Sequence, residues 1–245
     1  MKRKHWMQLG LAASSMVLLT GCYQRYQRQS SPKKEVATSQ TSAKKQAYNK
    51  QLYQSVFSDY QKIFATSNDL DAISKLNSQL AKEDRMINSW VIETVINQPE
   101  AVRYAFKDLN SDGVDEMIIA NQQTDGSYFA TGVYYLKDQK PTLLAEGFVA
   151  GHGGARNATT LYKGGEVLEV SWLSGTGRGV AVLSRIEKTP QAATKVQEEE
   201  VQVPGSDLNA LFGKSDEDKL DLKSFDWQTF ESTPSGGDTQ SQGKT

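Results

Sequence analysis

Oxygen-bearing side chains recur at alternate positions of one short segment of this 245-residue chain. The series is Asp108, Asn110, Asp112 and Glu116. Alternate residues of a tight loop project to one side, where several oxygens can replace the hydration shell of a cation. The backbone carbonyl of Val114 can add a further ligand. No histidine or cysteine lies nearby, so the set indicates a hard cation, calcium rather than zinc. A plain hairpin turn without an ion is the alternative.

Two strands must position this loop. Val102, Tyr104 and Phe106 alternate with polar or small residues before it, which predicts a strand with one buried face. The apolar run 114–120 after it predicts the returning strand. Gly113 permits the reversal of the backbone between them. The segment is therefore predicted to be a β-hairpin with an acidic turn.

The nine residues from Asp108 to Glu116 resemble the calcium loop of FG-GAP/VCBS-type repeats, in which a β-hairpin holds the ion. The resemblance implies a set of ligands carried over by position: the side chains of Asp108, Asn110, Asp112 and Glu116, and the carbonyl of Val114. The loop departs from an EF-hand, because its twelfth position is Ile119. The related loops often have Asp where this chain has Glu116, which leaves open whether one or both of its oxygens bind. Asp115 is expected to be an outer-shell charge.

The first residues have the parts of an export signal. Lys2, Arg3 and Lys4 precede an apolar stretch, 9–19, that is short for a membrane span. Leu19-Thr20-Gly21-Cys22 resembles a bacterial lipobox, which implies a diacylglyceryl group on Cys22 after removal of residues 1–21. An ordinary secretory signal that contains a cysteine is the alternative. Two acyl chains are enough for stable anchoring to a membrane.

Polar segments are expected to flank a single domain. Residues 22–45 are predicted to be a disordered basic tether, since residues 23–50 hold seven Lys/Arg and one Glu. That charge is suited to an anionic leaflet or wall polymer. The domain is predicted to span 46–231, and the Ser/Gly-rich residues 232–245 to be a disordered tail.

The domain is predicted to be α+β, with N-terminal amphipathic helices packed on an antiparallel β-meander sheet of about eight strands. Apolar residues at helical spacing predict helices between 46 and 98. Alternating runs in the β-rich part, 100–204, predict two four-strand meanders, with blade-like or sandwich architecture as the alternative. The C-terminal segment 205–231 is expected to start with a short helix, 207–212, and to pack Phe225, Trp227 and Phe230 onto the body.

Two glycine-rich segments, 151–157 and 174–179, lack the features of phosphate-binding loops. The first has no following helix, and the second lacks the Lys-Ser/Thr pair and precedes a strand. Ordinary hairpin connections explain both. A ligand pocket between them, with Arg156 and Arg178 as anion contacts and His152 as a polar contact, is the alternative.

The chain offers few catalytic groups. Its only cysteine is Cys22, and His152 is the only histidine after the signal. No nucleophile-elbow pattern precedes a helix. The formal net charge of −1 gives no reason to expect a nucleic-acid partner. No disulfide can form within the chain.

Together with the lipobox-like start, the segments Gly154–Asn157 and Trp172–Gly179 resemble uncharacterised surface lipoproteins of Gram-positive bacteria such as streptococci. We expect a non-enzymatic module, anchored outside the cell membrane, that binds a protein or a cell-wall component. A cell-wall-active hydrolase that uses carboxylates or His152 is the alternative.

Overall fold

The computed structural model describes residues 33–83, 85–151, 154–188 and 191–230. Residues 40–245 form one compact unit. A second unit, residues 1–39, is described only at the helical residues 33–39. The helices are α1 (Lys33–Leu52), α2 (Gln54–Phe64), α3 (Leu70–Ala81), α4 (Ser89–Asn97) and α5 (Leu208–Leu211).

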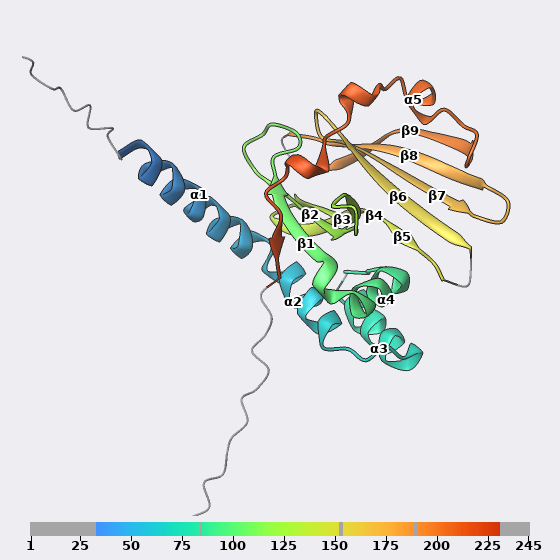
Figure 1. Ribbon diagram of the computed structural model, residues 1–245, viewed down its shortest axis with the longest axis horizontal. Helices are drawn as coiled ribbons and strands as arrows, with labels where there is room; N and C mark the ends of the chain where they lie inside the picture. Colours follow the sequence, from blue (N-terminus) through green and yellow to red (C-terminus); the bar gives the residue numbers. More distant parts are fainter. Residues whose placement is uncertain (1–32, 84, 152–153, 189–190, 231–245) are drawn as a thin grey trace, which may run out of the picture. The chain divides into compact units, whose positions relative to one another are not determined.

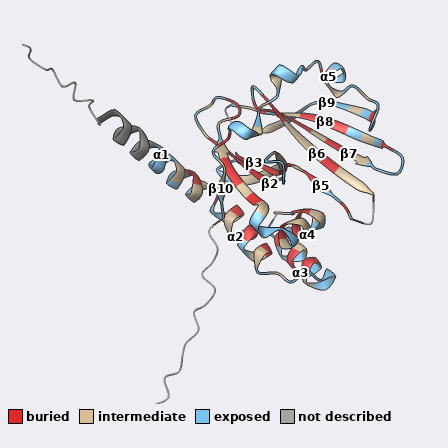
Figure 2. Ribbon diagram, viewed as in Figure 1, coloured by how far each residue is buried: buried red, intermediate tan, exposed pale blue. Residues whose placement is uncertain are grey.

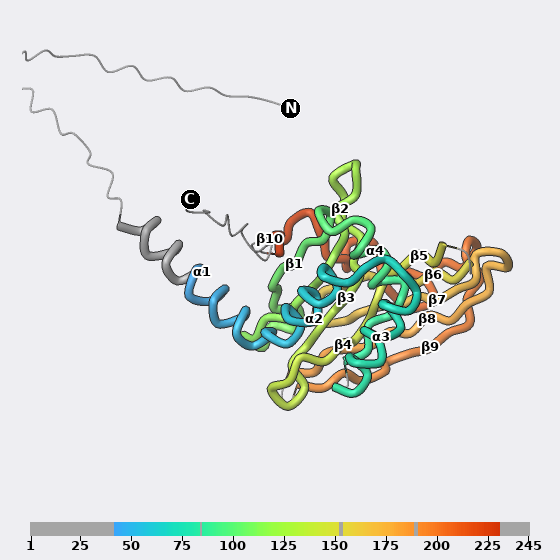
Figure 3. Tube along the Cα trace, turned by 90° about the horizontal axis from the view of Figure 1, so that it is seen from below, coloured from blue at the N-terminus to red at the C-terminus, as the bar shows by residue number. Residues whose placement is uncertain are grey.

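The strands form two antiparallel sheets of five strands each. Sheet A has the order β10-β1-β2-β3-β4, and sheet B has the order β5-β6-β7-β8-β9. Sheet A contains β1 (Val102–Lys107), β2 (Glu116–Gln122), β3 (Tyr128–Lys137), β4 (Lys140–Glu146) and β10 (Gln228–Thr229). Sheet B contains β5 (Phe148–Val149), β6 (Ala155–Tyr162), β7 (Glu166–Leu173), β8 (Arg178–Ile186) and β9 (Ala193–Gln202). Within sheet B the strands lie side by side in sequence order (Figure 3).

Sheet A is the middle layer of the unit (Figure 1). Tyr104 of β1 and Met117 and Ile119 of β2 pack in one cluster with α2, α3 and α4. The alternate residues Ala105 and Ile118 pack in a second cluster with residues of sheet B. The twofold repeat of a strand explains how one sheet serves both cores. Figure 2 shows β2 and β3 almost entirely buried, as expected for strands covered on both faces.

The C-terminal segment covers the other face of sheet B and returns to sheet A. Phe212 packs in the cluster of Leu168 and Leu183. Further along, Trp227 stacks on Tyr128 with ring centroids 4.6 Å apart. Phe230 stacks on Tyr60 of α2 with ring centroids 5.1 Å apart. The predicted packing of the C-terminal aromatic residues onto the body is confirmed.

The predicted α+β class, with helices N-terminal to the strands, is confirmed. All eight predicted strands are present, in two meanders, and the short strands β5 and β10 each add an edge. The two meanders are separate sheets that pack on each other, which is closer to a sandwich than to one sheet.

The structure differs from the predicted tether in residues 33–45, which belong to α1. Four of the thirteen residues of this stretch are Lys and two are Ala, and it has no Gly or Pro, which favours a helix. Its lack of an apolar stripe conceals it from pattern analysis. Helix α4 begins at Ser89, where the Asn88 side chain caps it by accepting a hydrogen bond from the Trp90 N–H.

Candidate metal site at the acidic loop

The loop between β1 and β2 is closed by its own side chains. Asp108 accepts hydrogen bonds from the backbone N–H groups of Asp112 at 3.2 Å and Gly113 at 3.0 Å. Asp112 in turn accepts from the N–H of Val114 at 2.8 Å. Gly113 has a φ of +91°, which a residue with a Cβ adopts only under strain. The predicted acidic hairpin turn is therefore present, with its carboxylates folded inward over the turn.

Glu116 lies at the base of the loop and is fully buried. Its Oε2 accepts a hydrogen bond from the Leu109 N–H at 2.8 Å. Burial, together with the nearby carboxylates of Asp112 and Asp108, raises the pKa of the Glu116 carboxyl to about 8, against the lowering effect of the Leu109 N–H. A buried acid beside two other acids is a site where positive charge is favourable.

Sheet B holds the loop through the connection between β8 and β9. Gln191 donates from Nε2 to Asp112 Oδ2 at 2.8 Å and to Glu116 Oε1 at 3.2 Å. Asn110, which is 2% exposed, donates from Nδ2 to the Glu187 carbonyl at 3.2 Å. A Cβ at Gly165, in the turn between β6 and β7, would lie only 2.7 Å from the Cβ of Asn110. Glycine at 165 therefore allows sheet B to approach the loop closely.

Asp115 points to the opposite side of sheet A, toward α1. Its carboxylate accepts hydrogen bonds from Lys45 Nζ at 2.8 Å and Asn49 Nδ2 at 2.7 Å. The Tyr53 hydroxyl donates to the Asp115 carbonyl at 3.0 Å. We expected Asp115 to be an outer charge of the metal site. The structure instead shows Asp115, which directly precedes β2, holding α1, with its side chain on the side of sheet A opposite to that of Glu116.

The donor set of the loop fits a hard cation in its chemistry, since the side chains of Asp108, Asn110, Asp112 and Glu116 all carry oxygen. The loop satisfies much of its acceptor capacity with its own N–H groups and with Gln191. In the described part of the chain, no three or more His, Cys, Asp or Glu side chains are gathered as a preformed metal site. A cation would therefore compete with these internal donors.

The structure does not bring Arg156 and Arg178 together. Arg156 pairs with Trp172, and Trp172 pairs with Gly179, so these three residues lie on one face of sheet B. Arg178 is the neighbour of Gly179 and lies on the other face. The guanidinium of Arg156 donates to the carbonyls of Ala150 and Ala155. His152, the third residue of the predicted pocket, and Cys22 lie outside the described residues.

A second carboxyl with a raised pKa, that of the half-buried Glu146, was not predicted from the sequence. Burial, together with the carboxylate of Glu169, raises the pKa of its carboxyl to about 7, against the lowering effect of the Asn88 N–H, which donates to Oε1 at 2.8 Å. Its backbone N–H donates to Glu169 Oε1 at 3.0 Å, and its carbonyl accepts from Asn157 and Thr159. Glu146 thus joins sheet A, sheet B and α4. The residue ends an alternating strand and carries no local signal of this role.

Comparisons with protein-family models, with curated proteins and with solved structures found no match to this chain. Among the described residues, no helix combines the length and the apolar character needed to cross a bilayer.

Proposed function

We propose that this chain is a lipid-anchored, extracytoplasmic surface protein that acts as a non-enzymatic binding module, with a structural calcium ion at the loop 108–116. The observation that carries the metal is the buried carboxyl of Glu116 beside the carboxylates of Asp108 and Asp112. Like charges this close disfavour full ionisation unless a cation offsets them. Calcium suits such a site, because it takes several oxygen ligands in flexible geometry.

The ion would be held by the side chains of Asp108, Asn110, Asp112 and Glu116 and by the carbonyl of Val114. Bound calcium supplies positive charge and a link between two core strands. The link is useful in this chain because its single cysteine leaves it without internal disulfides. Asn110 and Gln191 already connect the loop to sheet B, so an ordered loop also fixes the two sheets against each other.

The anchor is supported by Leu19-Thr20-Gly21-Cys22, whose cysteine is the only one in the chain. Acylation of Cys22 would place the described unit at the outer face of the cell membrane. The basic residues between 23 and 50 would add attraction to anionic lipid or wall polymer. The partner would then be a protein or a cell-wall component.

Calcium titration tests the metal. The purified full chain is melted in EGTA, in calcium and in magnesium, and calcium should raise its stability by about 2.7 kcal/mol at a concentration of 100 Kd. The double variant Asp108→Asn/Asp112→Asn should lose this increment. Asp125→Asn is the matched control, since Asp125 caps an exposed turn outside the loop. Equal melting of parent and double variant in calcium and in EGTA would exclude the metal.

Fractionation of cells tests the anchor separately. The parent should be recovered with membranes and Cys22→Ser in the medium. Retention of Cys22→Ser on membranes would count against lipid anchoring and leave the calcium result unaffected.

A second candidate, the carboxylate-dependent cell-wall hydrolase, is favoured by Glu146. A carboxyl with its pKa near 7 can act as a general acid at neutral pH, and Glu169 is a second carboxylate in its vicinity. Incubation of the purified chain with isolated cell wall, followed by assay of reducing ends, decides between the two. Reducing ends released by the parent, but by neither Glu146→Gln nor Glu169→Gln, would favour the hydrolase over the binding module.

A further inference from the structure

Strand β9 is the longest of the outermost strands of the two sheets. It has ten residues and ends the order of sheet B, so β8 is its only neighbour among the described strands (Figure 3). The other outermost strands are shorter, since β4 has seven residues and β5 and β10 have two each. A long outermost strand presents main-chain N–H and C=O groups that another strand can bond.

Hydrogen bonds at the end of β9 show which of its residues point away from β8. The Gln202 N–H donates to the Ser206 Oγ at 2.9 Å, and the Gln202 carbonyl accepts from the Ser206 N–H at 2.8 Å. Both main-chain groups of Gln202 therefore face outward. The register with β8 is regular over 197–202, and alternate residues of an antiparallel strand bond to the same side. The main-chain groups of Glu198 and Glu200 therefore face outward as well.

These two glutamates form the open part of the edge. In the described part of the chain, no loop or helix bonds to the main-chain groups of Glu198 or Glu200. Ser206 already occupies the groups of Gln202 at one end. At the other end a shift of register with β8 makes Val196 a bulge, which interrupts regular pairing. An added strand would thus find its hydrogen-bonding groups at Glu198 and Glu200.

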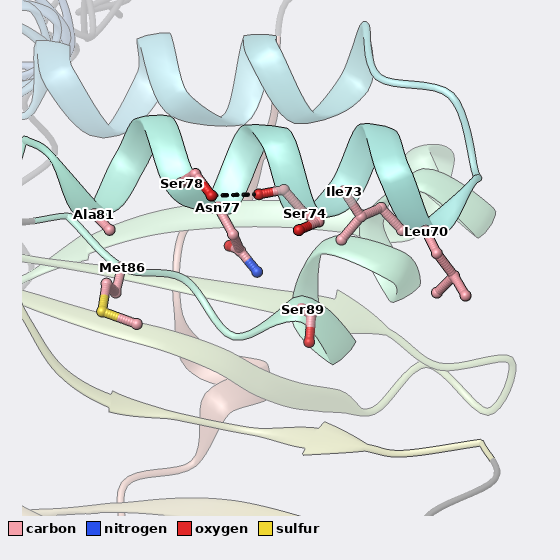
Figure 4. Close-up of a pocket in the computed structure, with 8 residues that line it drawn as sticks. All are labelled: Leu70, Ile73, Ser74, Asn77, Ser78, Ala81, Met86 and Ser89. Atoms are coloured by element: carbon pink, nitrogen blue, oxygen red, sulfur yellow. Dashed lines mark hydrogen bonds between the residues drawn. The ribbon is translucent and has the colours of Figure 1, made fainter.

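The same stretch carries negative charge that its surroundings do not offset. Glu198, Glu199 and Glu200 follow one another, and their neighbours on β8 are all valine or alanine. Glu198 has an exposed ion pair with Lys195 at 2.7 Å, whereas neither Glu199 nor Glu200 pairs with a cation among the described residues. The charge of this edge therefore selects the sign of a partner. By contrast, the hollow of about 430 Å³ along α3 (Figure 4) has no ionisable side chain in its described lining.

We propose that β9 accepts an extended, basic segment of a partner protein as an added antiparallel strand. The segment exchanges main-chain hydrogen bonds with Glu198 and Glu200, so its residues opposite them lie two positions apart and on the same face. Lysine or arginine at these two positions lies beside the glutamates, and opposite charges across such a pair are favourable. The inference rests on the proposed role as a binding module and requires neither calcium nor the anchor.

Charge disfavours the other strands that this edge could meet. Charged side chains on an outermost strand repel strands of the same sign. Two copies of β9 aligned at Glu199 would set Glu198 of one copy against Glu200 of the other. An anionic wall polymer is repelled in the same way, and a neutral glycan has no row of alternating main-chain donors and acceptors. A basic strand satisfies both the charge and the main-chain groups.

A short synthetic peptide in which lysine alternates with threonine, with blocked ends, is the probe. It should bind the purified full chain at low salt, and a peptide with glutamate in place of lysine should bind at least about tenfold more weakly. The double variant Glu198→Gln/Glu200→Gln should lower the affinity for the lysine peptide about tenfold. Glu100→Gln/Glu217→Gln is the matched control, because it removes the same charge from exposed positions outside both sheets.

N-methylation of the lysine amides in the peptide separates strand pairing from attraction by charge. The methylated peptide keeps its charge but loses the donors to Glu198 and Glu200, so it should bind at least about tenfold more weakly. Hydrogen exchange followed by NMR gives a second readout on the unchanged protein. The amides of Glu198 and Glu200 should exchange faster than those of Glu199 and Val201, which face β8, and the lysine peptide should slow them.

Several results would overturn the proposal: no binding of the lysine peptide, equal binding of the lysine and glutamate peptides, or equal binding of the methylated and unmethylated peptides. Unchanged exchange at Glu198 and Glu200 in the presence of bound peptide would place the peptide elsewhere. A dimer of the purified chain that the lysine peptide disperses would assign the edge to a second copy instead. Each of these results leaves the calcium and fractionation tests standing, so failure here is distinct from failure of the proposed function.

Discussion

Gln191 donates a hydrogen bond from Nε2 to Glu116 Oε1 over 3.2 Å, although 75 residues separate them along the chain. The same nitrogen reaches Asp112 Oδ2, and the Gln191 Oε1 accepts from the Leu136 N–H of β3 at 3.1 Å. One side chain from the β8–β9 connection thus contacts the acidic loop and a central strand of sheet A. Gln191 therefore links sheet B to sheet A by hydrogen bonds.

Replacement of Gln191 by alanine should lower the free energy of unfolding by about 1–3 kcal/mol. The change leaves the buried Glu116 Oε1 and the Leu136 N–H without their partner, and such unmade hydrogen bonds are costly. Urea unfolding at neutral pH measures the effect.

Gln123→Ala is the control for this experiment. Gln123 is an exposed glutamine whose side chain contacts only the nearby Asn121 carbonyl among its described hydrogen bonds. Gln123→Ala should change the free energy of unfolding by no more than about 0.5 kcal/mol. If Gln191→Ala lowers the free energy of unfolding no more than Gln123→Ala does, Gln191 does not join the sheets.

The sequence predicted those parts of the fold that depend on local periodicity. The strand patterns in the β-rich part predict eight strands in two meanders, and all eight are present. The cap of α4 and the contact with Gln191 depend on residues that carry no periodic signal. Gln191 in particular is one polar residue in a connection, and nothing in its neighbourhood indicates a contact 75 residues away.

In the candidate sites, too, the sequence predicts local groupings but not contacts between distant residues. Asp108, Asn110 and Asp112 lie within five residues, so their spacing alone predicts that they converge. Arg156 and Arg178 lie on different strands, and a difference of one residue in register puts them on opposite faces of sheet B. Sequence patterns without a register cannot decide between these faces.

Asp115→Ala should release α1 from the unit. The change removes the acceptor of Lys45 and of Asn49, which is only 3% exposed, and leaves a buried amide unpartnered. Hydrogen exchange of residues 42–52 should become faster, while exchange in α3 stays unchanged. Asp226→Ala is the matched control, since Asp226 also contacts α1, through Gln46, but in an exposed position. Equal exchange in both variants would mean that Asp115 does not hold the helix.

Glu116→Gln should have opposite effects with and without calcium. In EGTA the variant should be at least as stable as the parent, because the substitution removes a buried acid that Asp112 and Asp108 oppose. In calcium it should lose the increment that the parent gains, because a carboxylate ligand is missing. Paired thermal melts measure both effects. A variant that gains as much from calcium as the parent would remove Glu116 from the ligand set.

The pH dependence of stability should report on Glu146. Its pKa is about 7 in the folded protein and 4.5 in its ordinary state, so the folded protein holds this proton more tightly than the unfolded chain does. Its contribution to stability is therefore full below about pH 4.5 and is lost as the pH rises through about 7. The loss should be on the order of 3 kcal/mol.

Glu146→Gln should remove this loss of stability with rising pH, because glutamine can still accept from the Asn88 N–H but has no proton to lose. The acidic groups that face Glu146 are Glu169 from β7, Tyr60 from α2 and Tyr134 from β3. Both tyrosines have a raised pKa and stay neutral across this range, so Glu169 is the group whose charge opposes ionisation. Urea unfolding from pH 4.5 to 8 measures the slope, and Glu100→Gln, at an exposed glutamate, should keep it. An unchanged slope in Glu146→Gln would assign the dependence to other acids.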